Sequence, residues 1–99
     1  LGVKIWQLRQ DAPFEKRFIT LYGREDRGYG KPRREEYEAV YEGEVEKFDL
    51  EDVWERFARC VPADFQGHAL SVSDIVELTD GEASRFFYVE SDGFAEIEF

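Results

Sequence analysis

The first pattern along the chain is an alternation of apolar and polar positions that favours β-strands. From Val3 to Leu8, apolar side chains fall on both faces of an extended chain. This is typical of a strand that is buried on both sides near the centre of a sheet. From Tyr37 to Val45, acidic and apolar residues alternate, which predicts a half-buried strand with an acidic outer face. The residues expected on that outer face are Glu38, Val40, Glu42, Glu44 and Glu46, and those expected to face inward are Tyr37, Ala39, Tyr41 and Val45.

A first helix is predicted over residues 11–22. Asp11 is a candidate N-cap, Phe14, Phe18 and Leu21 follow at helical spacing, and Gly23 provides an end.

A second helix begins after Asp49, which is a candidate N-cap. Leu50, Val53, Trp54 and Phe57 form its apolar stripe. Pro62 lies where such a helix should have ended.

The last quarter of the chain contains three β-rich runs, 74–78, 85–90 and 94–99. The dipeptides Asp80-Gly81 and Asp92-Gly93 separate them and are typical of turns. The predicted order is β-α-β-α-β-β-β. We therefore expect one α+β domain over residues 1–99, with a mainly antiparallel sheet of about five strands and two helices.

Charge is distributed unevenly along the chain. The net charge is −10, but residues 1–34 carry nine Lys/Arg against four Asp/Glu. Glycines and a proline punctuate residues 23–36, so we predict an exposed, mobile basic loop there. Its cations could follow a phosphate backbone while interleaved tyrosines stack on bases. A solvated loop is the favoured interpretation, because the domain as a whole is acidic. The residues concerned are Arg24, Arg27, Lys31, Arg33 and Arg34, with Tyr22 and Tyr29.

A cluster of polar residues invites comparison with a catalytic triad. Asp64, His68, Ser71, Ser73 and Asp74 fall within eleven residues. Either serine could be a nucleophile, with His68 as the base and an aspartate as the orienting group. However, no glycine flanks the serines as in a nucleophile elbow. We therefore favour local bonds to the backbone at a loop-to-strand junction, and we assign no catalytic residue.

The composition argues against several other kinds of site. The single histidine and the scattered carboxylates lack the spacing of zinc or calcium sites, so no metal and no cofactor is expected. Cys60 is the only cysteine, which fits a reducing compartment and thus the cytoplasm. No apolar run has the length of a membrane span, so no membrane contact is expected. The chain contains no Met, and we expect it to be a piece of a longer protein.

One specific resemblance rests on four parts of the chain. These are Tyr37 to Val45, Leu50 to Phe57, the run from Pro62 through Gly67-His68 and Ser73-Asp74 to Val76, and the closing Tyr88 to Phe94. Together they resemble the YodL-like domain family of uncharacterised bacterial proteins, over roughly Tyr37 to Phe99. The resemblance implies an accessory module of proteins from plasmids, conjugative elements or phages. It supplies no catalytic residues.

The favoured hypothesis is a non-enzymatic interaction module with a protein partner, monomeric or weakly dimeric. The alternative is an acidic decoy that imitates nucleic-acid phosphates through Glu38, Glu42, Glu44 and Glu46 and inhibits a DNA-binding protein. A plain solvated face that protects an edge strand would explain the same glutamates. A Ser/His hydrolase is a third hypothesis, and direct contact with nucleic acid is expected only through the basic loop.

Overall fold

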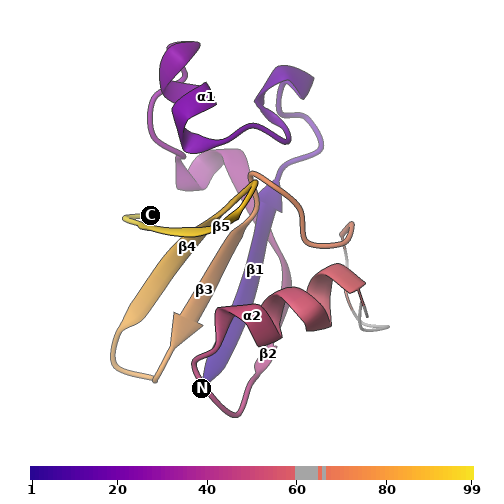
Figure 1. The fold of residues 1–99 in the computed structure, drawn as a ribbon, viewed down its shortest axis with the longest axis vertical. Helices are drawn as coiled ribbons and strands as arrows, with labels where there is room; N and C mark the ends of the chain where they lie inside the picture. The colour runs from indigo at the N-terminus through magenta and orange to yellow at the C-terminus, as the bar shows by residue number, and fades with distance from the viewer. Residues whose placement is uncertain (60–64, 66) are drawn as a thin grey trace.

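Five antiparallel strands form one sheet in the order β2-β1-β3-β4-β5. The computed structural model describes residues 1–59, 65 and 67–99, so the predictions that rest on Cys60, Pro62 and Asp64 lie outside the described residues. The strands are β1 (Gly2–Leu8), β2 (Tyr37–Glu44), β3 (Ile75–Thr79), β4 (Ser84–Glu90) and β5 (Gly93–Ile97). The single α+β domain with a five-stranded antiparallel sheet and two helices is thereby confirmed (Figure 1).

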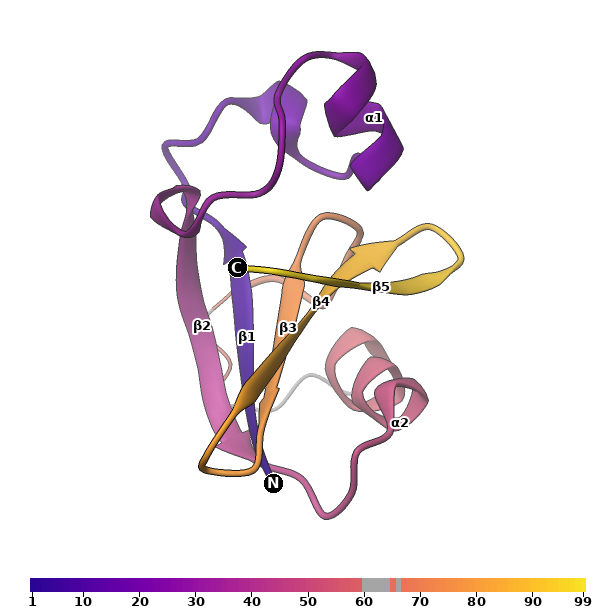
Figure 2. The ribbon, with the colours of Figure 1, turned by 90° about the vertical axis from the view of Figure 1, so that its left-hand side faces the viewer.

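The helical elements are short and lie on two sides of the sheet. They are η1 (Phe14–Lys16), α1 (Leu21–Asp26), η2 (Arg34–Glu36), α2 (Leu50–Trp54) and a π-helical continuation η3 (Glu55–Arg59). The segment with η1 and α1 lies over the end of the sheet where β1 finishes, whereas α2 lies against one face (Figures 1 and 2). No helix among residues 1–59, 65 and 67–99 is long and apolar enough to span a membrane.

The predicted first helix is wrong in position. Residues 14–16 form only a 3-10 turn, and α1 begins at Leu21, so that Gly23 lies inside the helix instead of ending it. Phe18 adopts a φ of 60°, which an α-helix does not allow. Thr20 is the true N-cap, because its side chain accepts a hydrogen bond from the Gly23 N–H at 3.1 Å. Phe14 and Phe18, predicted at helical spacing with Leu21, are 76% and 55% exposed.

The second helix begins where the sequence predicts. The Asp49 side chain accepts from the N–H groups of Glu51 at 3.0 Å and Asp52 at 3.3 Å, which satisfies two of the unpaired donors of the first turn. Val53 and Phe57 are fully buried, but Trp54 is 37% exposed. The predicted apolar stripe is therefore wrong at Trp54.

Each face of the sheet carries a hydrophobic cluster. The larger one lies under α2, where Val53 and Phe57 pack with residues of β1, β3 and β4. Phe94 of β5 lies at its margin. On the other face, a smaller cluster is covered by Leu21 of α1 and by Phe99, and its buried members are Leu8, Tyr37, Ile75 and Tyr88.

An irregularity in β2 overturns the predicted acidic face. Ile5 pairs with Tyr41, but the next residue, Trp6, pairs with Ala39, so Val40 is an extra residue on β2. Such a bulge reverses the alternation of side chains on either side of it. Val40 is buried and Ala39 exposed, opposite to expectation. Before the bulge Glu38 pairs with Gln7, whereas after it Glu42 pairs with Lys4. The prediction that Glu38 shares one face with Glu42 and Glu44 is therefore wrong.

Candidate functional site

The residues that suggested catalysis are bonded to a buried glutamine of the first strand. Gln7 and Asp74 are each 2% exposed. The Gln7 Nε2 donates to Asp74 Oδ2 at 3.0 Å and to the His68 carbonyl oxygen at 2.7 Å. Its Oε1 accepts from the His68 backbone N–H at 3.2 Å. One amide thus fixes the 68–74 segment against β1. The signal that sequence reasoning missed is the glutamine among the apolar residues that end the first strand.

Asp74 is a carboxyl group inside this network. Its Oδ2 also accepts from the Ser71 backbone N–H at 2.8 Å. Burial raises the pKa of Asp74 to about 8, although the bonds from Ser71 and Gln7 favour its charged form. Through these bonds Asp74 closes the turn that precedes β3.

The two serine hydroxyls are also engaged locally. Ser71 Oγ donates to the Ala69 carbonyl oxygen at 2.8 Å. Ser73 adopts a φ of 83°, and its Oγ accepts from the backbone N–H of Phe18 at 3.1 Å. Its carbonyl oxygen accepts from the Tyr37 hydroxyl at 2.7 Å. Ser73 thus joins the N-terminal segment to the sheet.

Within the described residues, His68 does not complete a triad with Asp74 and either serine. Its side chain is exposed, and its Nδ1 lies 2.8 Å from the Ala69 carbonyl oxygen and 3.3 Å from Gln7 Nε2. Among the residues that the structure describes, no hydrogen bond joins the imidazole to a hydroxyl of Ser71 or Ser73 or to the carboxyl of Asp74. The cluster therefore comes together in space, but in the geometry of a structural network and not of a relay.

Three of the five basic residues proposed for nucleic-acid contact bond within the protein: Arg24, Arg34 and, through a longer bond of 3.4 Å to the Glu15 carbonyl oxygen, Arg27. Arg24 is 0% exposed, and its guanidinium donates to the Gly30 carbonyl oxygen at 3.0 Å and to Glu36 Oε1 at 3.3 Å. Partial burial acts to raise the pKa of Glu36. The hydrogen bond from Lys16 and the positive charges of Lys16 and Arg24 outweigh that effect. They hold the pKa of Glu36 below its usual range.

Arg34 is held against an aromatic cluster. Its guanidinium carbon lies 5.0 Å from the ring centres of Trp6 and Phe99 and 5.4 Å from that of Phe86. Arg27, Lys31 and Arg33 are exposed. The segment 23–36 also contains most of α1 and all of η2, so it is more structured than the predicted loop.

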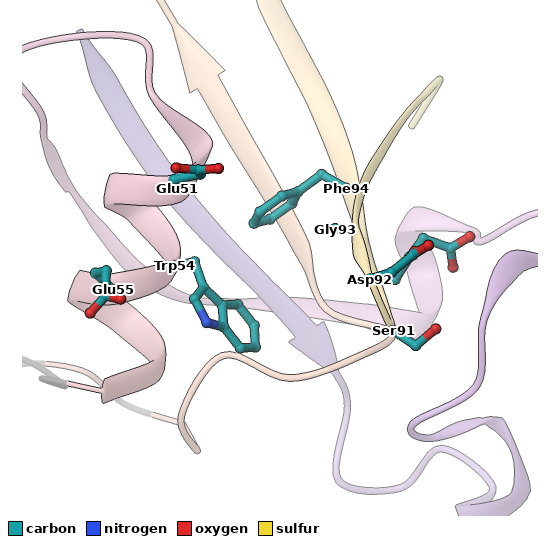
Figure 3. A pocket seen from close by; sticks show the side chains of 8 residues that line it. Glu51, Trp54, Glu55, Ser91, Asp92, Gly93 and Phe94 are labelled. Atoms are coloured by element: carbon teal, nitrogen blue, oxygen red, sulfur yellow. The ribbon is translucent and has the colours of Figure 1, made fainter.

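A groove lies between α2 and the turn from β4 to β5. Its volume is about 530 Å³, and α2 and η3 supply Glu51, Trp54 and Glu55 to its wall. The opposite wall consists of residues 90–94. The rings of Trp54 and Phe94 project from these two walls toward the space between them (Figure 3). The groove exists because α2 packs on β1, β3 and β4, while β5 continues the sheet beyond the helix.

The groove is strongly acidic. Four of its eight lining residues carry carboxylates, Glu51, Glu55, Glu90 and Asp92, and none is a lysine or arginine. Glu90 Oε1 accepts from the Leu21 backbone N–H at 2.9 Å, and Glu55 forms an exposed ion pair with Arg59 at 3.7 Å. In the described part of the chain, no three His, Cys, Asp or Glu side chains are grouped so that they could hold a metal ion. Sequence reasoning missed this groove because it placed Trp54 in the core.

Comparison with known proteins places the chain in a family but near no characterised protein. The family model described as "YodL-like domain" matches residues 2–99. The match extends beyond the Tyr37–Phe99 resemblance and includes the basic segment. No curated protein and no solved structure matches the chain.

Proposed function

The chain belongs to the YodL-like domain family, and we propose that it is a non-enzymatic protein-interaction domain. We place it in the bacterial cytoplasm as an accessory part of a plasmid, conjugative-element or phage protein. The single observation that carries the proposal is the acidic groove with the exposed Trp54. The groups that resembled a catalytic set, in contrast, are engaged with the backbone and with Gln7.

Trp54 supports an interaction surface for a physical reason. A partly exposed tryptophan at the rim of a groove offers apolar area that a partner can bury. Aromatic residues of this kind are enriched among the residues that dominate the binding energy of interfaces. Val53 and Phe57 of the same helical segment are fully buried and hold it on the sheet. Two residues other than Trp54 therefore anchor the helix on the sheet.

The acidic-decoy alternative has less support. It requires several carboxylates along one strand face, but the bulge at Val40 separates Glu38 from Glu42 and Glu44. Glu42 also lies 3.6 Å from Lys4, which partly neutralises it. The direct nucleic-acid alternative is weakened in the same way, because Arg24 is buried and the exposed Arg34 lies against aromatic rings of the protein itself.

Site-specific photo-cross-linking in the natural host tests the interaction proposal. We place p-benzoylphenylalanine at Ser91, which lines the groove, and in a matched variant at Glu42, which is exposed on β2. The expected result is a discrete cross-linked protein from position 91 that disappears with Trp54→Ala and is absent from position 42. No adduct, or the same adducts from both positions, would contradict the proposal.

An activity-based probe tests the non-enzymatic part. We expect no labelling of the purified protein by a fluorophosphonate probe and no hydrolysis of p-nitrophenyl esters above the His68→Ala background. Labelling that is lost in Ser71→Ala or Ser73→Ala would favour the hydrolase and overturn this part.

A further inference from the structure

We propose that the groove between α2 and the β4–β5 turn receives a lysine or arginine side chain from a basic segment of the partner protein. This inference rests on the proposed function and specifies the chemistry of its partner. It follows from three properties of the groove: its charge, its aromatic walls and the spacing of its carboxylates.

The charge of the groove selects a cation. Its lining carries carboxylates from both walls and no basic side chain. The Arg59–Glu55 pair is separated by one helical turn and both side chains are largely exposed, so it contributes little and can be exchanged for another partner. Most cations of the chain lie in residues 1–34, which carry nine of its thirteen Lys and Arg residues. The α1 part of that segment lies at the same end of the sheet as the β4–β5 turn, where the Leu21 N–H donates to Glu90, but none of its basic side chains lines the groove.

The aromatic walls select a cation that also has an apolar stem. Trp54 and Phe94 face the space between the walls (Figure 3). A guanidinium or ammonium over an indole ring is attracted by the negative face of the π-system, and the methylene stem of Arg or Lys covers apolar surface. The protein itself shows this arrangement elsewhere, and Arg34 and Arg85 are two examples. Arg34 lies over the rings of Trp6, Phe86 and Phe99, and Arg85 lies 4.8 Å and 5.2 Å from the ring centres of Phe48 and Phe87.

The spacing of the carboxylates argues against an inorganic cation. Calcium and magnesium need several oxygens within about 2.0–2.6 Å of one point. No three of the described acidic or metal-binding side chains are grouped in this way. A volume of about 530 Å³ is within the range of sites that enclose an organic ligand. The groove therefore suits a side chain with an extended apolar stem and a diffuse positive charge.

Nuclear magnetic resonance provides a test with an internal control. The chain has two tryptophans: Trp54 in the groove, and Trp6 on the opposite face, where its Nε1 donates to Glu77 Oε1 at 3.0 Å. We titrate the 15N-labelled protein with the peptide acetyl-Gly-Arg-Val-Arg-Gly-amide and, separately, with the same peptide carrying citrulline in place of arginine. The expected result is a shift of the Trp54 indole signal and of the Gly93 and Phe94 amides with the arginine peptide, and little change at Trp6.

Matched variants separate the groove from general electrostatic attraction. We expect Trp54→Ala to weaken binding of the arginine peptide about tenfold, and the pair Glu51→Gln and Asp92→Asn to weaken it by a similar factor. The pair Glu42→Gln and Glu44→Gln makes the same change in net charge on β2 and should alter the affinity less than about twofold. Equal losses for the two pairs would overturn the inference.

The remaining outcomes are equally decisive. Equal binding of the citrulline peptide would show that charge is not recognised. Spermidine that shifts the Trp54 signal as strongly as the peptide would show a site for free polyamines. Peptide-induced shifts away from the groove, or none at all, would overturn this inference alone, because the cross-linking experiment at position 91 tests the proposed function independently.

Discussion

Gln7 and Asp74, 67 positions apart in the sequence, share a hydrogen bond of 3.0 Å in a buried seam between β1 and the turn that precedes β3. The bond connects the first strand to the segment with the most specific family resemblance. It gives these polar residues a structural role: the glutamine amide supplies donors and an acceptor that the turn needs once it is removed from water. Most of our predictions about folding concern this seam.

The titration of Asp74 should make the protein less stable as the pH rises. The folded-state pKa is raised to about 8 from an ordinary value of 3.8, so the folded protein holds a proton that the unfolded chain releases. The resulting stability is present below about pH 4 and is lost progressively as the pH rises to about 8, on the order of a few kcal/mol in total. Urea unfolding of wild type and Asp74→Asn across this range measures it. The free energy of unfolding should fall more steeply with pH in the wild type than in the variant, and parallel pH profiles would contradict the assignment.

Removal of the Gln7 side chain should lower the free energy of unfolding. Gln7→Ala leaves Asp74 and the backbone of His68 without their partner in a buried place, which we expect to reduce the free energy of unfolding by about 3 kcal/mol. Gln10→Ala is the matched control, because Gln10 is exposed, and it should cost less than about 0.5 kcal/mol. Chemical denaturation of both variants at pH 6 provides the comparison. Similar values for the two would show that the seam is not important for stability.

Any substitution that adds a β-carbon at Gly67 should destabilise the fold while Gln7 is present. A Cβ at position 67 would overlap Gln7 Oε1, so Gly67→Ala should destabilise the fold by about 1–3 kcal/mol. In the Gln7→Ala background the same substitution should cost less, because the obstructing oxygen is gone. A double-mutant cycle measures the coupling between the two positions. Additive effects would place the cause elsewhere, in the backbone of residue 67 itself.

Arg24 should be a structural residue instead of a nucleic-acid contact. Arg24→Ala removes a fully buried guanidinium that binds Glu36 and the Gly30 carbonyl oxygen, and we expect a loss of about 3 kcal/mol in the free energy of unfolding. Arg27→Ala, an exposed change on the same segment, should be nearly neutral. Thermal unfolding of the two variants distinguishes them. An Arg24→Ala protein of wild-type stability that loses retention on heparin would reverse the assignment.

Local patterns were sufficient for most of the secondary structure. The apolar pattern from Val3 to Leu8 and the turn at Asp80-Gly81 depend on neighbouring residues alone. The first strand and the β3–β4 hairpin lie where we expected them. The Asp49 cap is equally local, since its partners are two and three residues away. For these elements the side-chain period and the capping chemistry are the determining interactions, and both can be read from the order of residues.

Interactions between distant segments decided the rest. The helix after Asp11 was misplaced because Ser73 accepts the Phe18 N–H and Glu90 of β4 accepts the Leu21 N–H. The bulge at Val40 appears only when β2 pairs with β1. Likewise, Trp54 has the spacing of a core residue, and it is exposed because β5 extends past α2 and leaves a groove there. Periodicity indicates which residues share a face of one element. Long-range packing decides what that face contacts, and it therefore sets the buried network and the candidate binding site.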